Sequence, residues 1–198
     1  MKATKSAGVI ALFALLVNLT STAHAALEYD EYIERAQKAR ARGDWQDAAT
    51  NYAEAINHPD RPKKTTEWSE LHLDYGRAMG VLCQYAEATL FLERGLEIAK
   101  KGNVSPARAL YELGSVAAAE KKHALAVMHL NTLFAELEKR DAAQLTPTQW
   151  TDARTKLVFG LEALGKSEEA ARWRTAATKA ADAGTRGIVP YGSRCPAR

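Results

Sequence analysis

A small residue followed twelve positions later by an alanine recurs four times along this chain of 198 residues. The pairs are Ala36 with Ala48, Gly76 with Ala88, Gly114 with Ala126 and, less regularly, Val158 with Ala170. Small side chains at this spacing let two antiparallel helices approach closely. A hairpin this short cannot bury its own apolar stripe, so neighbouring hairpins have to cover it. The pattern therefore predicts a serial array of helix hairpins.

Composition between residues 30 and 181 favours helices throughout. Alanine, leucine, glutamate and lysine predominate, and no stretch of any length has the β-branched alternation of a half-buried strand. Proline and glycine gather at residues 57–62, 101–106 and 145–147, which we expect to join successive hairpins. We predict an all-α fold, an α-solenoid of about four helix hairpins over residues 26–182.

The expected turns inside hairpins are shorter. Gly43 and Gly165 can adopt a positive φ at the end of a helix, and Asp44 then caps the following helix. Thr146 is a second expected cap, because a proline follows it at the first helical position, where a missing N–H costs nothing.

Residues 1–25 have the organisation of an export signal. Two lysines precede an apolar run over residues 7–17, and residues 23–25 form the small-x-small pattern that signal peptidase cleaves. The run is shorter than the ~20 residues that cross a bilayer. We therefore expect cleavage before Ala26 and a periplasmic or secreted mature chain without a membrane span.

The charge balance argues against nucleic acid as a partner. The formal net charge is +3, and the expected leader carries two of the lysines and no acidic residue. The basic residues between 35 and 42 alternate with alanine and glycine beside acidic neighbours, which is typical of a solvated helix face. We expect no nucleic-acid site.

The repeated residues resemble the tetratricopeptide repeat, a helix hairpin with characteristic small and aromatic positions. The matching residues are Tyr32, Ala36, Ala39, Gly43, Trp45, Ala48, Tyr52 and Ala55, then His72, Tyr75, Gly76, Met79, Tyr85, Ala88, Leu92 and Gly95, then Leu110, Leu113, Gly114, Ala117, His123, Ala126, Leu130 and Leu133. They cover residues 29–139 with a longer period than the usual 34 residues. Residues 150–182 fit less well, as a true repeat or as a capping hairpin, because Arg174 stands where a large apolar residue is expected.

The resemblance implies a concave groove lined by the first helix of each hairpin. It places Ile33, Gln37 and Ser115 there, and as binding candidates Arg40, Leu73, Arg77, Arg108, Tyr111 and Phe159. Three arginines among apolar neighbours suit a carboxylate or an extended acidic peptide, because guanidinium groups grip carboxylates in two places. The alternative is that these arginines are simply solvated.

No residue pattern indicates catalysis. The histidines that follow the leader form no i, i+4 pair of the kind that binds zinc, and neither a nucleophile elbow nor a glycine-rich phosphate loop occurs. We expect no catalytic site, no metal and no cofactor.

The chain has two cysteines, Cys83 and Cys195. Export would allow a disulfide between them, although both could also remain free. Residues 183–198 lack a helical period and form an expected extended tail. Our hypothesis is that this tail runs back along the array and is joined to Cys83, with Val189 and Tyr191 covering apolar surface.

These features together predict a non-enzymatic, exported scaffold that mediates protein–protein interaction in cell-envelope assembly or secretion. One alternative is a binder of a small anionic ligand, a peptide or a cell-wall fragment in the arginine and tyrosine groove. Another is the accessory subunit of an enzyme. The sequence indicates neither a particular partner nor an oligomeric state.

Overall fold

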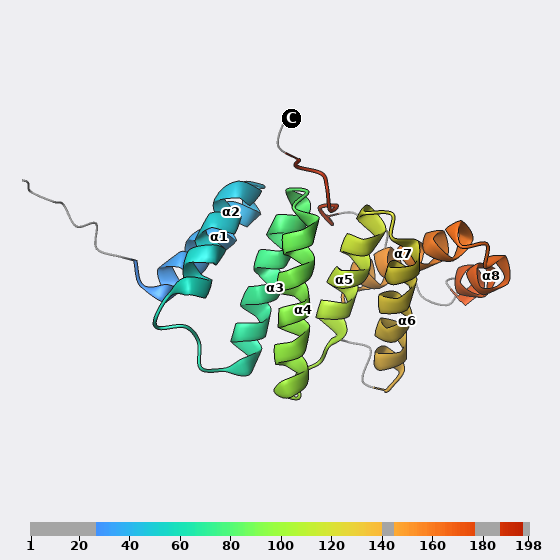
Figure 1. Cartoon of the computed structure of the whole chain (residues 1–198), viewed down its shortest axis with the longest axis horizontal. Helices are drawn as coiled ribbons and strands as arrows, with labels where there is room; N and C mark the ends of the chain where they lie inside the picture. Colours follow the sequence, from blue (N-terminus) through green and yellow to red (C-terminus); the bar gives the residue numbers. More distant parts are fainter. Residues whose placement is uncertain (1–26, 140–144, 177–186, 196–198) are drawn as a thin grey trace, which may run out of the picture.

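The computed structural model describes residues 27–139, 145–176 and 187–195 (Figure 1). Its helices pair into four antiparallel hairpins: α1 (Tyr29–Ala41) with α2 (Trp45–Asn57), α3 (Thr65–Val81) with α4 (Tyr85–Lys101), α5 (Ala107–Ala119) with α6 (His123–Lys139), and α7 (Pro147–Ala163) with α8 (Ser167–Ala176). The described ranges contain no strand. Figure 1 shows the hairpins stacked in sequence order, so the predicted all-α, solenoid-like fold is confirmed. None of the helices described combines the length and apolar character that a membrane span requires.

The small residues of the repeat lie where the two helices of a hairpin meet. A β-carbon at Gly76 would lie 2.8 Å from Leu92 Cγ and 3.0 Å from the carbonyl oxygen of Ala88, both on α4. A β-carbon at Gly114 would lie 2.6 Å from the Leu130 side chain on α6. The glycines therefore set the distance between paired helices, as the sequence pattern predicts.

The fourth hairpin keeps the buried alanine but changes the first helix. Ala170 is fully buried, whereas Val158 is only partly buried. The close approach is made instead by Gly160, whose absent β-carbon would lie 2.9 Å from Val127 on α6. Gly160 therefore brings α7 against the preceding hairpin rather than against its own partner helix.

The expected helix starts and turns are present. The Asp44 carboxylate accepts the Asp47 N–H at 3.0 Å, and Gly43 before it has a φ of +78°. Thr146 caps α7 by accepting the N–H of Gln149 at 3.2 Å, and the Gln149 side chain accepts the Thr146 N–H in return. Such reciprocal bonds satisfy backbone donors that the helix itself cannot pair.

Two apolar clusters form the core. One joins the first two hairpins around Trp45, Tyr52 and Leu92, and the other joins the last two around Leu130 and Leu157. Helix α5 contributes residues to both clusters, so the core runs along the array without a break. The tail residues Val189 and Tyr191 pack on the first cluster.

Candidate binding groove

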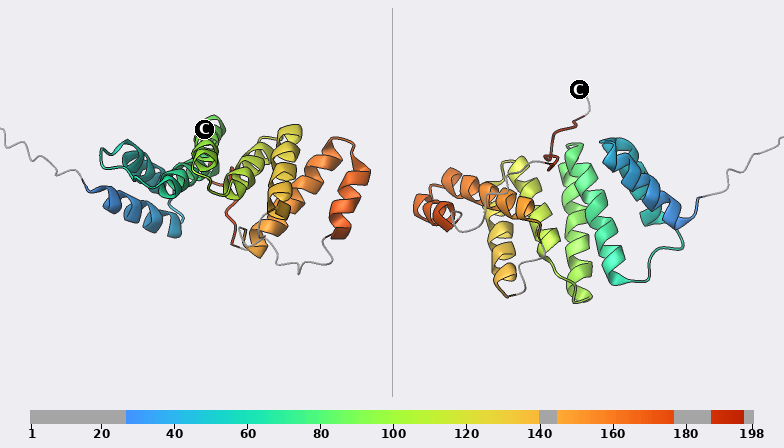
Figure 2. Two further views of the ribbon diagram at one scale, coloured as in Figure 1. Left: turned by 90° about the horizontal axis from the view of Figure 1, so that it is seen from below. Right: turned by 180° about the vertical axis from the view of Figure 1, so that it is seen from behind.

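Among the first helices of the hairpins, α5 contacts both α3 and α7, and Arg40 of α1 reaches Asp74 of α3. We call the surface of α1, α3, α5 and α7 the groove. The described part of the tail, residues 187–195, lies against it, and Figure 2 shows this segment beside α3 and α5. The rest of the predicted tail, residues 183–186 and 196–198, and the expected leader, residues 1–25, lie outside the described residues.

The tail is fixed at the C-terminal end of α3. Cys83 and Cys195 form a disulfide with a Cα–Cα distance of 5.2 Å. The Gly192 N–H donates to the Gly80 carbonyl and the Arg194 N–H to the Val81 carbonyl, both at 3.0 Å. The last carbonyls of a helix lack a partner within the helix. The Gly80 carbonyl also accepts the Cys83 N–H at 3.1 Å. The tail therefore completes the end of α3, and the predicted junction with Cys83 is confirmed.

The ring of Tyr191 occupies a notch at Gly80. A β-carbon at Gly80 would overlap two ring carbons of Tyr191, so only glycine leaves room for this ring. The Tyr191 hydroxyl donates to Glu112 Oε2 on α5 at 2.8 Å. Burial and the nearby Glu112 charge raise the pKa of Tyr191 well above its usual range, so the hydroxyl keeps its proton at neutral pH.

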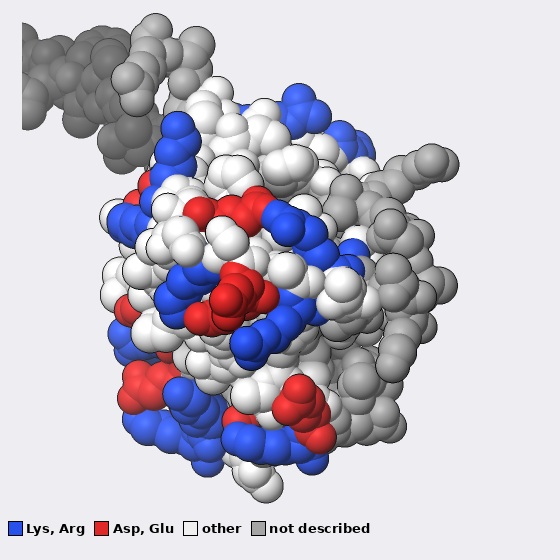
Figure 3. Space-filling view, turned by 90° about the vertical axis from the view of Figure 1, so that its right-hand side faces the viewer, with Lys and Arg blue, Asp and Glu red and all other residues white. Residues whose placement is uncertain are grey.

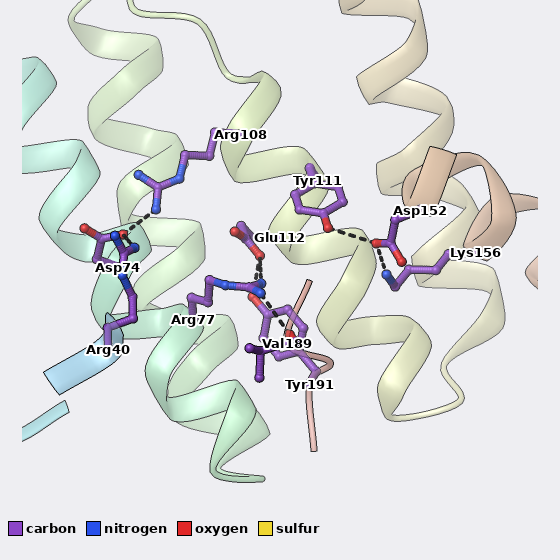
Figure 4. Close-up of polar contacts among 10 residues, drawn as sticks. All are labelled: Arg40, Asp74, Arg77, Arg108, Tyr111, Glu112, Asp152, Lys156, Val189 and Tyr191. Atoms are coloured by element: carbon purple, nitrogen blue, oxygen red, sulfur yellow. Dashed lines mark hydrogen bonds and ion pairs between the residues drawn. The ribbon is translucent and has the colours of Figure 1, made fainter. Parts of the chain in front are cut away.

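Arg77 binds both the groove wall and the tail. Its guanidinium donates to Glu112 Oε2 and to the Val189 carbonyl, each at 2.9 Å, and lies 5.4 Å from the centre of the Tyr191 ring (Figure 4). The side chains of Arg77 and Glu112 are 14% and 3% exposed. Burial opposes the charge on Arg77, but Glu112, Tyr191 and Tyr111 together outweigh it, and the pKa of Arg77 rises. Arg77 thus holds an extended backbone as well as a carboxylate.

Asp74 joins two further arginines across three hairpins. Arg40 of α1 donates to Asp74 Oδ1 at 3.3 Å, and Arg108 of α5 bonds the same oxygen and also pairs with Glu70. Burial raises the pKa of Asp74 to about 6, although the Arg40 charge opposes this shift. Each predicted groove arginine therefore already has a carboxylate partner within the chain.

Tyr111 links the third hairpin to the fourth. Its hydroxyl donates to Asp152 Oδ2 on α7 at 2.9 Å, and Lys156 pairs with the same carboxylate (Figure 4). Burial and the Asp152 charge raise the pKa of Tyr111 above its usual value. The polar contacts thus follow the groove from α1 to α7.

Two cavities remain beside the tail. The charged pocket, of about 470 Å³, is lined by Arg40, Asp74, Arg77, Arg108, Tyr111, Glu112, Thr146, Gln149, Gly187 and Ile188. The apolar pocket, of about 390 Å³, lies between α5, α7 and the tail. Its lining includes Ser115, Ala118, Ala119 and Phe159 on the helices, with Ile188, Val189, Pro190 and Tyr191 on the tail.

Five of the six predicted groove residues meet at these pockets: Arg40, Arg77, Arg108, Tyr111 and Phe159. Leu73 does not, and its assignment to the groove needs correction. Its side chain is 2% exposed and packs where Gly95 of α4 leaves room, so it belongs to the core of the second hairpin. The arginines are neither free for a ligand nor simply solvated, because in-chain carboxylates neutralise them.

The sequence analysis did not predict the carboxylates that pair with the groove residues, Asp74, Glu112 and Asp152. A detectable signal existed: Arg40 and Asp74, and likewise Asp74 and Arg108, are 34 residues apart, and Arg77 and Glu112 are 35 apart. Opposite charges at about one repeat length face each other on neighbouring first helices.

Other surfaces carry a mixed charge pattern. At the α8 end of the array, basic and acidic side chains are interspersed (Figure 3). Among the described residues, no group of histidine, cysteine and carboxylate side chains is arranged to hold a metal ion.

Comparison with known proteins gives a likeness of fold. Neither a family model nor a curated protein matches the chain. Among solved structures, BtubC (BKLC) from P. vanneervenii is similar, with a TM-score of 0.69 and 17% sequence identity over 88% of this chain and 70% of that chain. At this identity the likeness concerns the helical fold alone.

Proposed function

We propose that this chain is a non-enzymatic scaffold of the tetratricopeptide type that binds extended segments of partner proteins in the cell envelope. The observation that carries the proposal is the tail itself. The groove holds residues 187–195 through Arg77 on a backbone carbonyl and through a tyrosine in the Gly80 notch. A surface that accommodates a non-helical segment of its own chain, extended at residues 188–190, has the shape and polar groups to accommodate another.

The hairpin stack supports this reading. A serial array of helices presents a long, shallow surface, and such surfaces suit extended polypeptides. The residues that resemble the tetratricopeptide repeat lie at the helix contacts, with Gly76 and Gly114 as examples.

A small anionic ligand is the less favoured candidate. The charged pocket has three arginines, but Asp74, Glu112 and Glu70 pair with them. An incoming anion would have to compete with these carboxylates, two of which are largely buried.

We further propose that the chain is exported, with its N-terminus at Ala26. The leader pattern motivates this, and the disulfide between Cys83 and Cys195 is compatible with an oxidising compartment. Intact mass of the protein purified from the envelope fraction of the expressing cell tests it. A mass that corresponds to residues 26–198 is expected, and retention of the leader would contradict the proposal.

Selection from a library of random twelve-residue peptides tests the binding function. The oxidised chain, residues 26–198, serves as the target, and amide chemical shifts locate each selected peptide. We expect peptides whose footprint covers α5, α7 and tail residues 187–191. A Leu90→Ser variant, changed at an exposed residue outside both groove pockets, is the control and should bind equally well. Failure to enrich any peptide, or footprints confined to α4 and α6, would contradict the proposal.

A further inference from the structure

Tyr191 occupies a defined site on the groove. The site lies between α3 and α5: Gly80 provides the notch for the ring, Arg77 lies beside it, and Glu112 accepts the hydroxyl proton in a hydrogen bond. We call it the Tyr191 site. In a repeat array, a site between two first helices recurs between the next two.

The recurrence falls on the apolar pocket. The second and third hairpins are 38 residues apart, which relates Arg77 to Ser115 and Gly80 to Ala118. Both Ser115 and Ala118 line the apolar pocket between α5 and α7. This pocket therefore lies between the next pair of first helices, beside the Tyr191 site, with the Ala118 methyl group where Gly80 leaves the notch. No described residue of the chain fills it as Tyr191 fills the first site.

The pocket has the lining of a site for an aromatic ring. Ala118 and Ala119 leave room on α5, and Phe159 on α7 is 59% exposed. Tail residues Ile188 and Pro190 form the opposite wall. A cavity of about 390 Å³ with mainly apolar walls is within the size range of binding pockets.

One polar group in this pocket lacks a partner. The Ser115 side chain is 1% exposed, and its hydroxyl makes no hydrogen bond within the described structure. Buried hydroxyl groups without a partner are uncommon, because each loses its hydrogen bonds to water. A ligand with an apolar body and one hydrogen-bonding group would satisfy it.

We propose that the apolar pocket binds a tyrosine side chain of an extended partner segment, with the ring against Ala118 and Phe159 and the hydroxyl at Ser115. The tail forms one wall, so the disulfide keeps the site assembled. This inference rests on the proposed function and specifies its partner as a tyrosine-bearing extended polypeptide. The precedent within the chain is Tyr191, a tyrosine held between the preceding pair of first helices.

The test uses a synthetic peptide that copies residues 188–192, acetylated and amidated at its ends, and the same peptide with alanine in place of its tyrosine. Both are titrated into the ¹⁵N-labelled, oxidised chain of residues 26–198. We expect saturable shifts at Ser115, Ala118, Thr155 and Phe159. The alanine peptide should bind about ten-fold more weakly or worse, because aromatic anchors dominate such contacts. Equal affinity of the two peptides would overturn the inference.

Variants of the chain localise the effect. Ala118→Leu fills the pocket at a partly exposed position and should weaken the tyrosine peptide about ten-fold or more, whereas Ala86→Leu at an exposed position on α4 should leave its affinity unchanged. Phe159→Ala should also weaken binding of the tyrosine peptide. This change removes an exposed side chain, so its effect does not require the fold to accept a larger residue. Unchanged affinity in both pocket variants would overturn the inference.

The double variant Cys83→Ser/Cys195→Ser tests the tail as a wall. We expect at least a five-fold loss of affinity at the α5–α7 site, and an unchanged affinity there would overturn the composite site.

The peptide library separates this inference from the proposed function. Library peptides that bind the groove while the tyrosine peptide leaves Ser115 and Ala118 unshifted would overturn the inference alone, and failure of both would overturn both.

Discussion

The site between α3 and α5 holds a tyrosine of the chain itself, whereas the equivalent site between α5 and α7 is open. The difference follows from two positions. Arg77 reaches the tail carbonyl and Glu112, while its equivalent Ser115 is too short to do either. Gly80 leaves a notch where Ala118 has a methyl group. Small changes between repeats thus decide which part of a groove is closed by the chain and which part is available.

The largest expected effect comes from releasing the tail. Cys83→Ser/Cys195→Ser removes a link across 112 residues and should lower the free energy of unfolding by about 4 to 5 kcal/mol in the chain-entropy account. Urea denaturation measures the loss, and hydrogen exchange should show α3 losing more protection than α7. A loss under about 1 kcal/mol, or equal changes in both helices, would remove the distinction between the two sites.

Arg77 and Ser115 should differ in how much each contributes to the free energy of unfolding. Arg77→Met leaves Glu112 buried without its charged partner and should cost about 3 to 5 kcal/mol of unfolding free energy. Ser115→Ala removes a hydroxyl that has no partner, so it should change stability by less than about 1 kcal/mol or raise it. Chemical denaturation of both variants makes the comparison. Similar costs at the two positions would mean that Arg77 does not hold the closed site.

The Gly80 notch is tested by the effect of Gly80→Ala on stability, measured with and without the Tyr191 ring. Gly80→Ala should cost about 1 to 3 kcal/mol in the natural chain, because the new methyl group overlaps Tyr191. In a Tyr191→Ala background the same change should be neutral or stabilising by up to about 1 kcal/mol, because alanine favours helix over glycine. The same effect in both backgrounds would show that the ring does not occupy the notch.

The smallest effect concerns pH. His72 lies in α3 with its ring 4.4 Å from that of Trp68, while the equivalent residue in α5 is Leu110. Burial lowers the pKa of His72, so the folded chain binds fewer protons than the unfolded chain once pH falls below about 6.5. Its stabilising contribution is present above that pH and is lost as the pH falls.

Unfolding curves between pH 5 and pH 7.5 measure the pH effect. The natural chain should lose stability relative to His72→Leu as the pH falls, by at most about 1.4 kcal/mol per pH unit, the limit for one proton. Parallel pH profiles of the two proteins would contradict the assignment.

Local and periodic features of the fold were readable from the sequence. The small residues at Gly76 and Gly114 mark close helix contacts, and Thr146 caps its helix as expected, because both depend on a few neighbouring positions. The junction of Cys83 with Cys195 was inferable because the chain has two cysteines. The small residue at the close contact of α7 is Gly160 and not the predicted Val158, because this contact is made with α6 and not with α8.

The groove chemistry was harder to predict. The resemblance placed Leu73 in the groove, but its side chain packs in the core where Gly95 has no side chain. The positions of the arginines were predicted, but their ion pairs were not. These pairs depend on carboxylates one hairpin away, such as Asp74 and Glu112. The hydrophobic period of one helix does not show which of its residues contact the next hairpin.

The central claim is that the tail is fixed on the second hairpin and closes one site of the groove. Thiol alkylation of the purified, unreduced chain, followed by mass measurement and proteolytic mapping, tests it most directly. We predict no alkylated cysteine before reduction, two after reduction, and a linked pair of peptides that contains Cys83 and Cys195. Two alkylated cysteines in the unreduced protein would contradict the account.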